Sequence, residues 1–304
     1  MNRWTQRMRV EARDLFELFL LPALAALLPW RVAFRLLRRA ALHLRPYREA
    51  ADVALAQASG RGWMGEAPRW VLVRRLVTLV DHADLFLAKT RSDAWMARHL
   101  DVHGEWPAAG QAGLICTFHI GAGMWGLRHA RASGLKAHAI VAPLEGAHFG
   151  GRSVLLAYAR ARTAEVARSL GCPTLDMSVS LRPVLQALRR GEQVVAAIDV
   201  PADQVSASEE IKLLGLRARV PRGLLRLAVD QALPVTVYIT GLDVATGMRT
   251  LHIHQLGVRN DLRQLIEEVF AFLDKAIRDD PPAWHFWGEA NRIFVPDQAR
   301  DSLG

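Results

Sequence analysis

Residues 113–127 read GLICTFHIGAGMWGL, and the other predicted elements are placed relative to this stretch. The apolar residues 114–118 are sufficient for one buried strand. His119 follows directly, the small residues Gly121 and Gly123 let another molecule approach the backbone closely, and a helix-like segment follows the turn. A strand that ends in His before a Gly-rich turn places the imidazole at the carboxyl edge of a sheet, where open α/β sheets bind ligands. His119 is therefore a candidate functional residue; the alternative is a buried His that only ends a strand.

Strand-like and helix-like segments alternate on the C-terminal side of this stretch. Further strands are predicted at residues 137–143, 173–175, 193–198, 235–241 and 250–255. Helices are predicted at residues 154–170, 180–190, 220–233 and 260–278, and residues 200–210 read as a polar loop. On the N-terminal side, residues 49–100 have a helical pattern. This alternation predicts an α/β fold with a mixed, mostly parallel sheet flanked by helices on both faces.

The composition limits the kinds of partner. The chain has 304 residues and a net charge of +9, and arginine supplies nearly all of its positive charge. Such an excess suggests an anionic partner: phosphate-bearing lipid, an acidic carrier protein or nucleic acid. We expect no nucleic acid, because the basic residues are scattered and form no platform with aromatic residues. The two cysteines, Cys116 and Cys172, lie in apolar surroundings, which implies no disulfide framework and fits a reducing compartment.

The N-terminal residues combine an apolar run with arginine. The run at residues 15–30 is interrupted by Glu17 and Pro22, and it is shorter than the ~20 residues of a spanning helix. Residues 31–48 are basic, with arginines largely on one helical face, which suits the surface of an anionic bilayer. We therefore expect a membrane-associating helical segment at residues 1–48 and an α/β domain at residues 49–304. The alternative is a pair of ordinary packed helices whose arginines face water.

Several parts of the chain, taken in order, carry a resemblance. They are the apolar N-terminal run with its arginine-rich flank, the strand ending in His119-Ile-Gly, the Arg160-x-Arg162 segment, residues 185–199 (LQALRRGEQVVAAID) and residues 281–294 (PPAWHFWGEANRIF). Together they resemble the lipid A biosynthesis (lauroyl/myristoyl) acyltransferases, within the wider lysophospholipid acyltransferase superfamily. The likeness covers most of the chain.

The resemblance implies an activity and a location. It implies an acyltransferase-like domain that moves an acyl chain from acyl carrier protein or coenzyme A to a hydroxyl of a glycolipid or other amphipathic acceptor. It also implies a peripheral or monotopic protein on the cytoplasmic face of the inner membrane, with membrane lipid and the acyl carrier as partners. No separate cofactor is expected. We predict no metal either, because His252 and His254 share one face of a predicted strand without an evident third ligand.

One element of the family pattern is missing. In the family, His is followed by four residues and then Asp or Glu, a carboxylate that would orient the imidazole as in a Ser-His-Asp triad. Here that position is Met124, and allowing one inserted residue gives Trp125 instead. Three explanations are open: Asp199 or Glu145 replaces the acid, a backbone carbonyl holds His119 for an easier acceptor, or the chain binds lipid or carrier without catalysing transfer.

The candidate residues therefore have the following expected roles. His119 would be the general base that takes a proton from the attacking hydroxyl, a role worth typically 10²–10⁴-fold. Asp199 would orient His119 or place the donor, with a structural Asp at a strand end as the alternative. Arg160 and Arg162 would contact phosphate, which a guanidinium fork matches, or would simply form a solvated helix face. Glu145 and its following Gly superficially resemble the phosphate-binding Glu-Gly of glycerophosphate acyltransferases, without the Thr-Arg that follows there.

Overall fold

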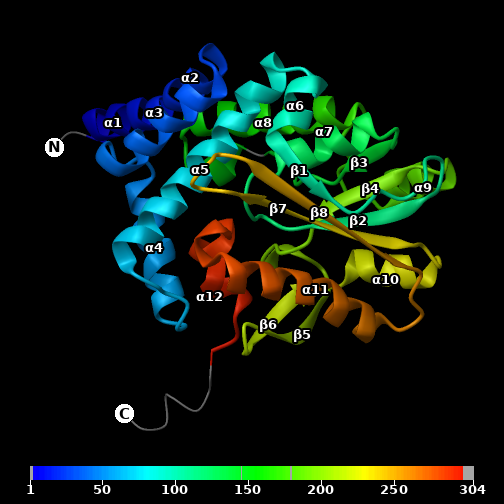
Figure 1. Cartoon of the computed structure of the whole chain (residues 1–304). Coiled ribbons are helices and arrows are strands. Elements are labelled where there is room, and N and C mark those ends of the chain that lie inside the picture. The colour runs from blue at the N-terminus through cyan, green and yellow to red at the C-terminus, as the bar shows by residue number, and fades with distance from the viewer. Residues whose placement is uncertain (1–2, 145, 179, 297–304) are drawn as a thin grey trace, which may run out of the picture.

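A six-stranded mixed sheet is the framework of the computed structural model, which describes residues 3–144, 146–178 and 180–296 (Figure 1). The strand order is β1-β8-β7-β2-β4-β3. The strands are β1 (Leu100–His103), β2 (Gly113–Thr117), β3 (Ala137–Ala139), β4 (Gln193–Ala197), β7 (Val235–Leu242) and β8 (Arg249–Gly257). Four of the five pairings are parallel, and only β7 and β8 run antiparallel. The predicted α/β class with a mostly parallel sheet is confirmed.

Strand β2 lies inside the sheet because its side chains are apolar on both faces. Its first four residues are buried, as expected for a strand covered by helices on both sides. It pairs in parallel with β7 and with β4, and the register with β4 aligns Thr117 with Ala197. The chain continues beyond both strands at the same sheet edge, so His119 and Asp199, each two residues further along, are brought together.

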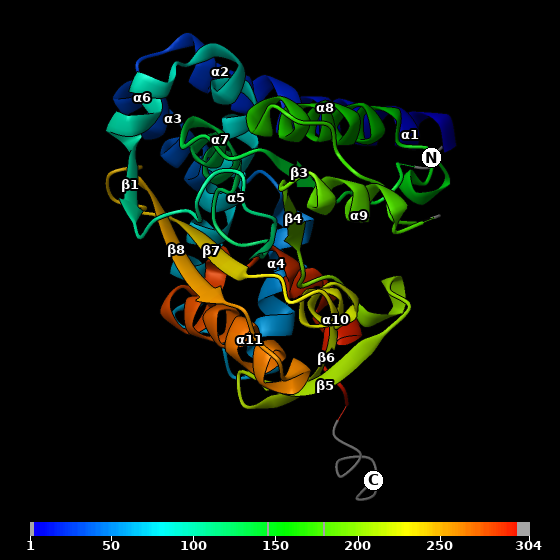
Figure 2. The ribbon, with the colours of Figure 1, turned by 90° about the vertical axis from the view of Figure 1, so that its right-hand side faces the viewer.

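Helices cover the two faces of the sheet. On one side lie α5 (Ala67–Thr90), α7 (Met124–Ala132) and α8 (Ser153–Leu170). The other side is covered by α10 (Gly223–Asp230) and α11 (Leu262–Asp279), beside the antiparallel hairpin of β5 (Ser208–Leu213) and β6 (Leu216–Pro221) (Figures 1 and 2). The apolar stripe of α11 is fully buried and gives this second face of the sheet its core.

The N-terminal residues form a helical layer against α5. Its elements are α1 (Arg3–Leu15), the π-helix η1 (Phe16–Leu20), α2 (Leu21–Leu27), α3 (Trp30–His43) and α4 (Arg48–Ser59). Buried side chains of this layer, such as Leu21 and Leu37, belong to the same hydrophobic cluster as the sheet residue Ile115. In the described ranges, no helix has both the length and the apolar character needed to cross a membrane.

Short elements complete the described chain. They are α6 (Asp93–His99), η2 (Gly146–Phe149), α9 (Arg182–Arg189), η3 (Ala202–Gln204), η4 (Pro281–Ala283), η5 (His285–Glu289) and α12 (Ala290–Ile293). The last three belong to a C-terminal segment that returns to the sheet edge, where Trp284 forms an antiparallel bridge with Ile120.

Three secondary-structure predictions were wrong in part. The helix predicted at 220–233 begins only at Gly223, because Val220 and Pro221 end β6. The loop predicted at 200–210 already contains the first residues of β5, whose exposed charged side chains conceal the alternating buried ones. The strand predicted at 137–143 ends at Ala139, because Ile140 next bridges Leu175 in place of a continued ladder. The strand predicted at 173–175 is reduced to this single bridge at Leu175.

Candidate functional site

His119 lies at the carboxyl edge of the sheet, in a turn that packs directly on β7. Gly121 has φ +67°, and a Cβ there would lie 2.3 Å from the Thr240 carbonyl oxygen, so only glycine fits. The Thr240 hydroxyl donates a hydrogen bond to the Ile120 carbonyl oxygen at 2.8 Å. The turn is therefore held tightly against the sheet, while the His119 side chain keeps 39% of its surface exposed.

Asp199 is the carboxylate that contacts His119. It is 1% exposed, and its Oδ1 lies 2.8 Å from the His119 Nδ1. The His119 backbone N–H donates to both carboxylate oxygens, at 3.1 and 2.9 Å. The Trp284 indole N–H donates to Oδ2 at 2.9 Å. Because an ionised carboxylate only accepts, Nδ1 must carry a proton, which leaves Nε2 as the basic nitrogen of the neutral ring.

The surroundings of Asp199 keep it charged. Burial alone would raise the pKa of this carboxyl, but the nearby His119 and the hydrogen bonds from His119 and Trp284 outweigh it and lower the pKa below its ordinary value. Asp199 is therefore ionised at neutral pH, the state in which it orients an imidazole and stabilises an imidazolium.

The C-terminal segment, residues 281–293, packs against the turn that carries His119. The Gly121 N–H donates to the Ala283 carbonyl oxygen at 3.1 Å, and the His285 N–H donates to the His119 carbonyl oxygen at 2.7 Å. The His285 Nε2 lies 2.7 Å from the Gly121 carbonyl oxygen. Phe286 stacks on the His119 imidazole, with ring centroids 4.1 Å apart and planes 15° from parallel. These contacts fix the position and the plane of the imidazole.

A buried arginine makes hydrogen bonds to the backbone of this segment. Arg74 of α5 donates to the Trp284 and His285 carbonyl oxygens at 2.7 and 2.9 Å, and its burial lowers its pKa to about 10. The helical pattern of residues 49–100 contained no chemical signal for it, so sequence reasoning missed Arg74. It also assigned no role to Trp284 or Phe286, although both lie in the segment that carried the resemblance.

The two arginines predicted to contact phosphate do not act as a pair. They lie two residues apart on α8, so they point to different sides of the helix. Arg160 is exposed. Arg162 binds the buried Asp81 at 2.8 Å and lies 3.3 Å from the Tyr158 hydroxyl. A phosphate at Arg162 would have to compete with a carboxylate already in place.

The structure also shows where Gly123 and Met124 lie. Gly123 is the residue before α7, with φ −76°. Met124, the position that the resemblance compares with the acid of the family pattern, is buried and lies 3.5 Å from the Ser169 hydroxyl. Glu145 lies outside the described residues. Within the described ranges, no three His, Cys, Asp or Glu side chains are grouped as a metal site requires.

Comparison of the sequence with protein-family models and with curated proteins finds no match. What the site does must therefore be argued from its geometry.

Proposed function

We propose that this protein transfers an acyl chain from a carrier thioester, acyl carrier protein or coenzyme A, to a hydroxyl of a glycolipid or other amphipathic acceptor. The observation that supports this most directly is the contact between His119 Nδ1 and the buried Asp199. It leaves Nε2 as the basic atom of a partly exposed ring whose plane is fixed by Phe286. That is the arrangement a general base for a hydroxyl requires.

The reaction proceeds by attack of the acceptor oxygen on the thioester carbonyl carbon. As the new C–O bond forms, the hydroxyl proton passes to His119 Nε2, and Asp199 stabilises the imidazolium. The C–S bond then breaks, and the departing thiolate takes the proton back from His119. Proton transfer of this kind contributes typically 10²–10⁴-fold to the rate.

Asp199 fills the role of the missing family acid from a different strand. Catalytic triads are defined by geometry and not by sequence order, so an acid after β4 serves as well as one on α7. The position on α7 is buried and occupied by Met124, which packs in the core. The loss of the acid in the local motif therefore does not argue against catalysis.

The test uses the purified full-length chain with acyl carrier protein and coenzyme A thioesters and a panel of glycolipid and lysophospholipid acceptors. Thiol release and acylated product are measured together. We expect His119→Ala to lose at least 10²-fold in turnover, with unchanged circular dichroism. His103→Ala is the matched control, because His103 also contacts an aspartate, Asp101, at 3.1 Å but is exposed.

One outcome would replace the proposal. If the wild type and His119→Ala are equally inert with every carrier-linked donor, yet both bind lipid or carrier, the protein is a catalytically silent binding protein. Activity that is equal in the two proteins would also exclude His119 as the base.

A further inference from the structure

Strand β5 has one free edge in the described part of the chain. It pairs with β6 alone, in a hairpin that lies beside α11 and apart from the six-stranded sheet (Figures 1 and 2). The outer edge of β6 is covered, because Ala218 bridges Phe294 and the Val295 N–H donates to the Arg217 carbonyl oxygen at 2.9 Å. A free strand edge presents N–H and C=O groups that can pair with a further strand.

The register of the hairpin shows which backbone groups face the free edge. The Arg217 carbonyl oxygen points to Val295 and away from β5, so its ladder partner Lys212 also directs its N–H and C=O away from β6. Alternation gives Glu210 the same orientation, whereas Ile211 faces β6. Within the described residues, the backbone N–H and C=O groups of Glu210 and Lys212 have no hydrogen-bond partner.

The surface beside this edge is hollow and carries an unpaired charge. A groove of about 860 Å³ lies between β5 and α11. On the β5 side, Glu210 and Lys212 are exposed, and Ile211 between them is buried. Arg217 binds the Glu210 carboxylate at 2.7 Å, whereas Lys212 makes no ion pair with any described residue. Lysine on an edge strand opposes pairing with another strand, unless a carboxylate lies opposite it.

We infer that β5 pairs with β5 of a second copy of this chain, antiparallel and about a two-fold axis at Ile211. In this register, Glu210 of each copy lies opposite Lys212 of the other. Both residues direct their backbone groups outwards, so each of these pairs exchanges two N–H···O bonds. The two hairpins then form one four-stranded antiparallel sheet, and each copy contributes the same surface, as a two-fold dimer requires.

Charge and hydrogen bonding together select this register and this partner. A slip that places Glu210 opposite Glu210, or Lys212 opposite Lys212, brings like charges together, which is destabilising. A slip by one residue places these positions opposite Ile211, whose backbone groups already face β6. A partner strand must therefore carry Glu and Lys two residues apart, in that order, and β5 is itself such a strand.

The first experiment is sedimentation velocity of the purified full-length chain over a series of concentrations. We expect a dimer whose fraction rises with concentration. Glu210→Lys and Lys212→Glu each place like charges in both cross-strand pairs, and each should weaken the dimer on the order of tenfold or more. An equal mixture of the two variants has opposite charges in both pairs again, so the mixture should form the dimer as the wild type does.

A matched control separates this contact from an effect of net charge. Arg182→Glu makes the same change of charge as Lys212→Glu, at an exposed position that begins α9. It should dimerise as the wild type does, and mixing it with Glu210→Lys should restore nothing. His119→Ala should also dimerise normally, because no residue of the contact belongs to the His119 site. Dimerisation and acyl transfer can therefore fail separately.

Amide hydrogen exchange followed by NMR tests the register in the wild type, without any substitution. The amides of Glu210 and Lys212 should exchange fast in the monomer and become protected as the dimer forms. The Ile211 amide faces β6 and should be protected in both states.

Three results would overturn the inference. The first is a monomer at every concentration, which would leave the β5 edge to a strand of a different protein. The second is equal association of the wild type and both single variants, which would place the contact elsewhere, such as on the exposed apolar side chains of the N-terminal helices. The third is a mixture that associates no better than its two components.

Discussion

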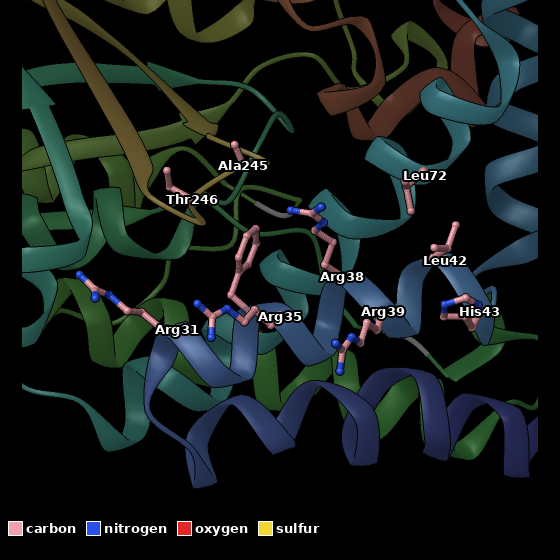
Figure 3. A pocket seen from close by; sticks show the side chains of 10 residues that line it. Arg31, Arg35, Arg38, Arg39, Leu42, His43, Leu72, Ala245 and Thr246 are labelled. Carbon is pink, nitrogen blue, oxygen red and sulfur yellow. The ribbon is translucent and has the colours of Figure 1, made fainter.

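The His119 site and the α3 groove, which is lined by Arg31, Arg35, Arg38 and Arg39 (Figure 3), hold their charged groups in opposite ways. At the site, Asp199 is 1% exposed and receives N–H groups from His119 and Trp284, and Arg74 is buried against backbone carbonyls. In the groove, the arginines of α3 are exposed and, within the described residues, unpaired. A buried charge without partners is strongly destabilising, whereas an exposed one costs little. The paired, buried charges therefore fix the geometry of the His119 site, whereas the exposed arginines of α3 remain accessible to an anion.

The largest effect should come from breaking the site at its carboxylate. In Asp199→Asn, three N–H groups would face a side chain with one acceptor oxygen and an N–H₂ of its own. The wrong imidazole tautomer would be favoured, and the corresponding change in a serine protease lowers turnover about 10⁴-fold. We expect a comparable fall in kcat, measured by thiol release.

The same substitution also tests how much the fold depends on the site. Removing one partner from a buried charged contact typically costs about 3–5 kcal/mol, so the Tm should fall as well. Trp284→Phe removes only one donor and should give a smaller loss in both measurements. Asp101→Asn, on the exposed His103 pair, is the control and should change neither. Retention of more than a tenth of the activity in Asp199→Asn would show that Asp199 does not orient the base.

The central sheet and the place of His119 could be predicted because they depend on local patterns. The apolar run at residues 114–118 became β2, and the strand predicted at 193–198 became β4. β2 ends two residues before His119 and β4 ends two residues before Asp199. Asp199 could therefore be proposed as a replacement acid. The choice between Asp199 and Glu145 could not be made, since it requires knowing that β2 and β4 are adjacent.

Other parts of the site depend on contacts between residues far apart in the chain. Arg74 donates a hydrogen bond to the carbonyl oxygen of Trp284, which lies 210 residues further along the chain. No local sequence pattern around either residue predicts this contact. The hairpin of β5 and β6 was missed for a different reason. Its outward side chains are Glu, Lys and Arg, so the alternation of buried residues was too short to distinguish from a polar loop.

An effect of intermediate size should be a loss of folding stability at acid pH, which arises from two buried histidines. Burial lowers the pKa of His285, in the C-terminal segment of the site, to about 4, and that of His82, on α5, to about 3. Both are thus neutral in the folded protein, while the unfolded chain binds a proton below about pH 6.5. Stability should therefore be complete above pH 6.5 and fall as the pH drops towards 4, by up to about 2 kcal/mol per histidine at pH 5.

Urea unfolding between pH 7.5 and pH 5 measures this slope. His285→Gln should flatten it, although the variant will be less stable overall because His285 contacts the Gly121 carbonyl oxygen. His43→Gln is the comparison from the groove, where the imidazole is exposed to solvent in the folded as in the unfolded state. If His43→Gln flattens the slope as much as His285→Gln does, the acid sensitivity does not arise at the site.

The smallest effect, and one of opposite sign, should come from the groove itself. Arg31, Arg35 and Arg39 follow one another at four-residue intervals on α3, and like charges in such pairs destabilise a helix by about 0.2–0.5 kcal/mol each. Replacing Arg31, Arg35, Arg38 and Arg39 by Gln should therefore raise the free energy of unfolding by up to about 1 kcal/mol at low salt, and by less at high salt, where the repulsion is screened. Urea titrations at about 0.1 M and about 1 M salt would resolve this, with Gln at the exposed Arg69, Arg182, Arg189 and Arg219 as control. A loss of more than about 2 kcal/mol in the groove variant would mean that these arginines hold the fold together. A gain would show that repulsion among these arginines destabilises α3, as their spacing predicts.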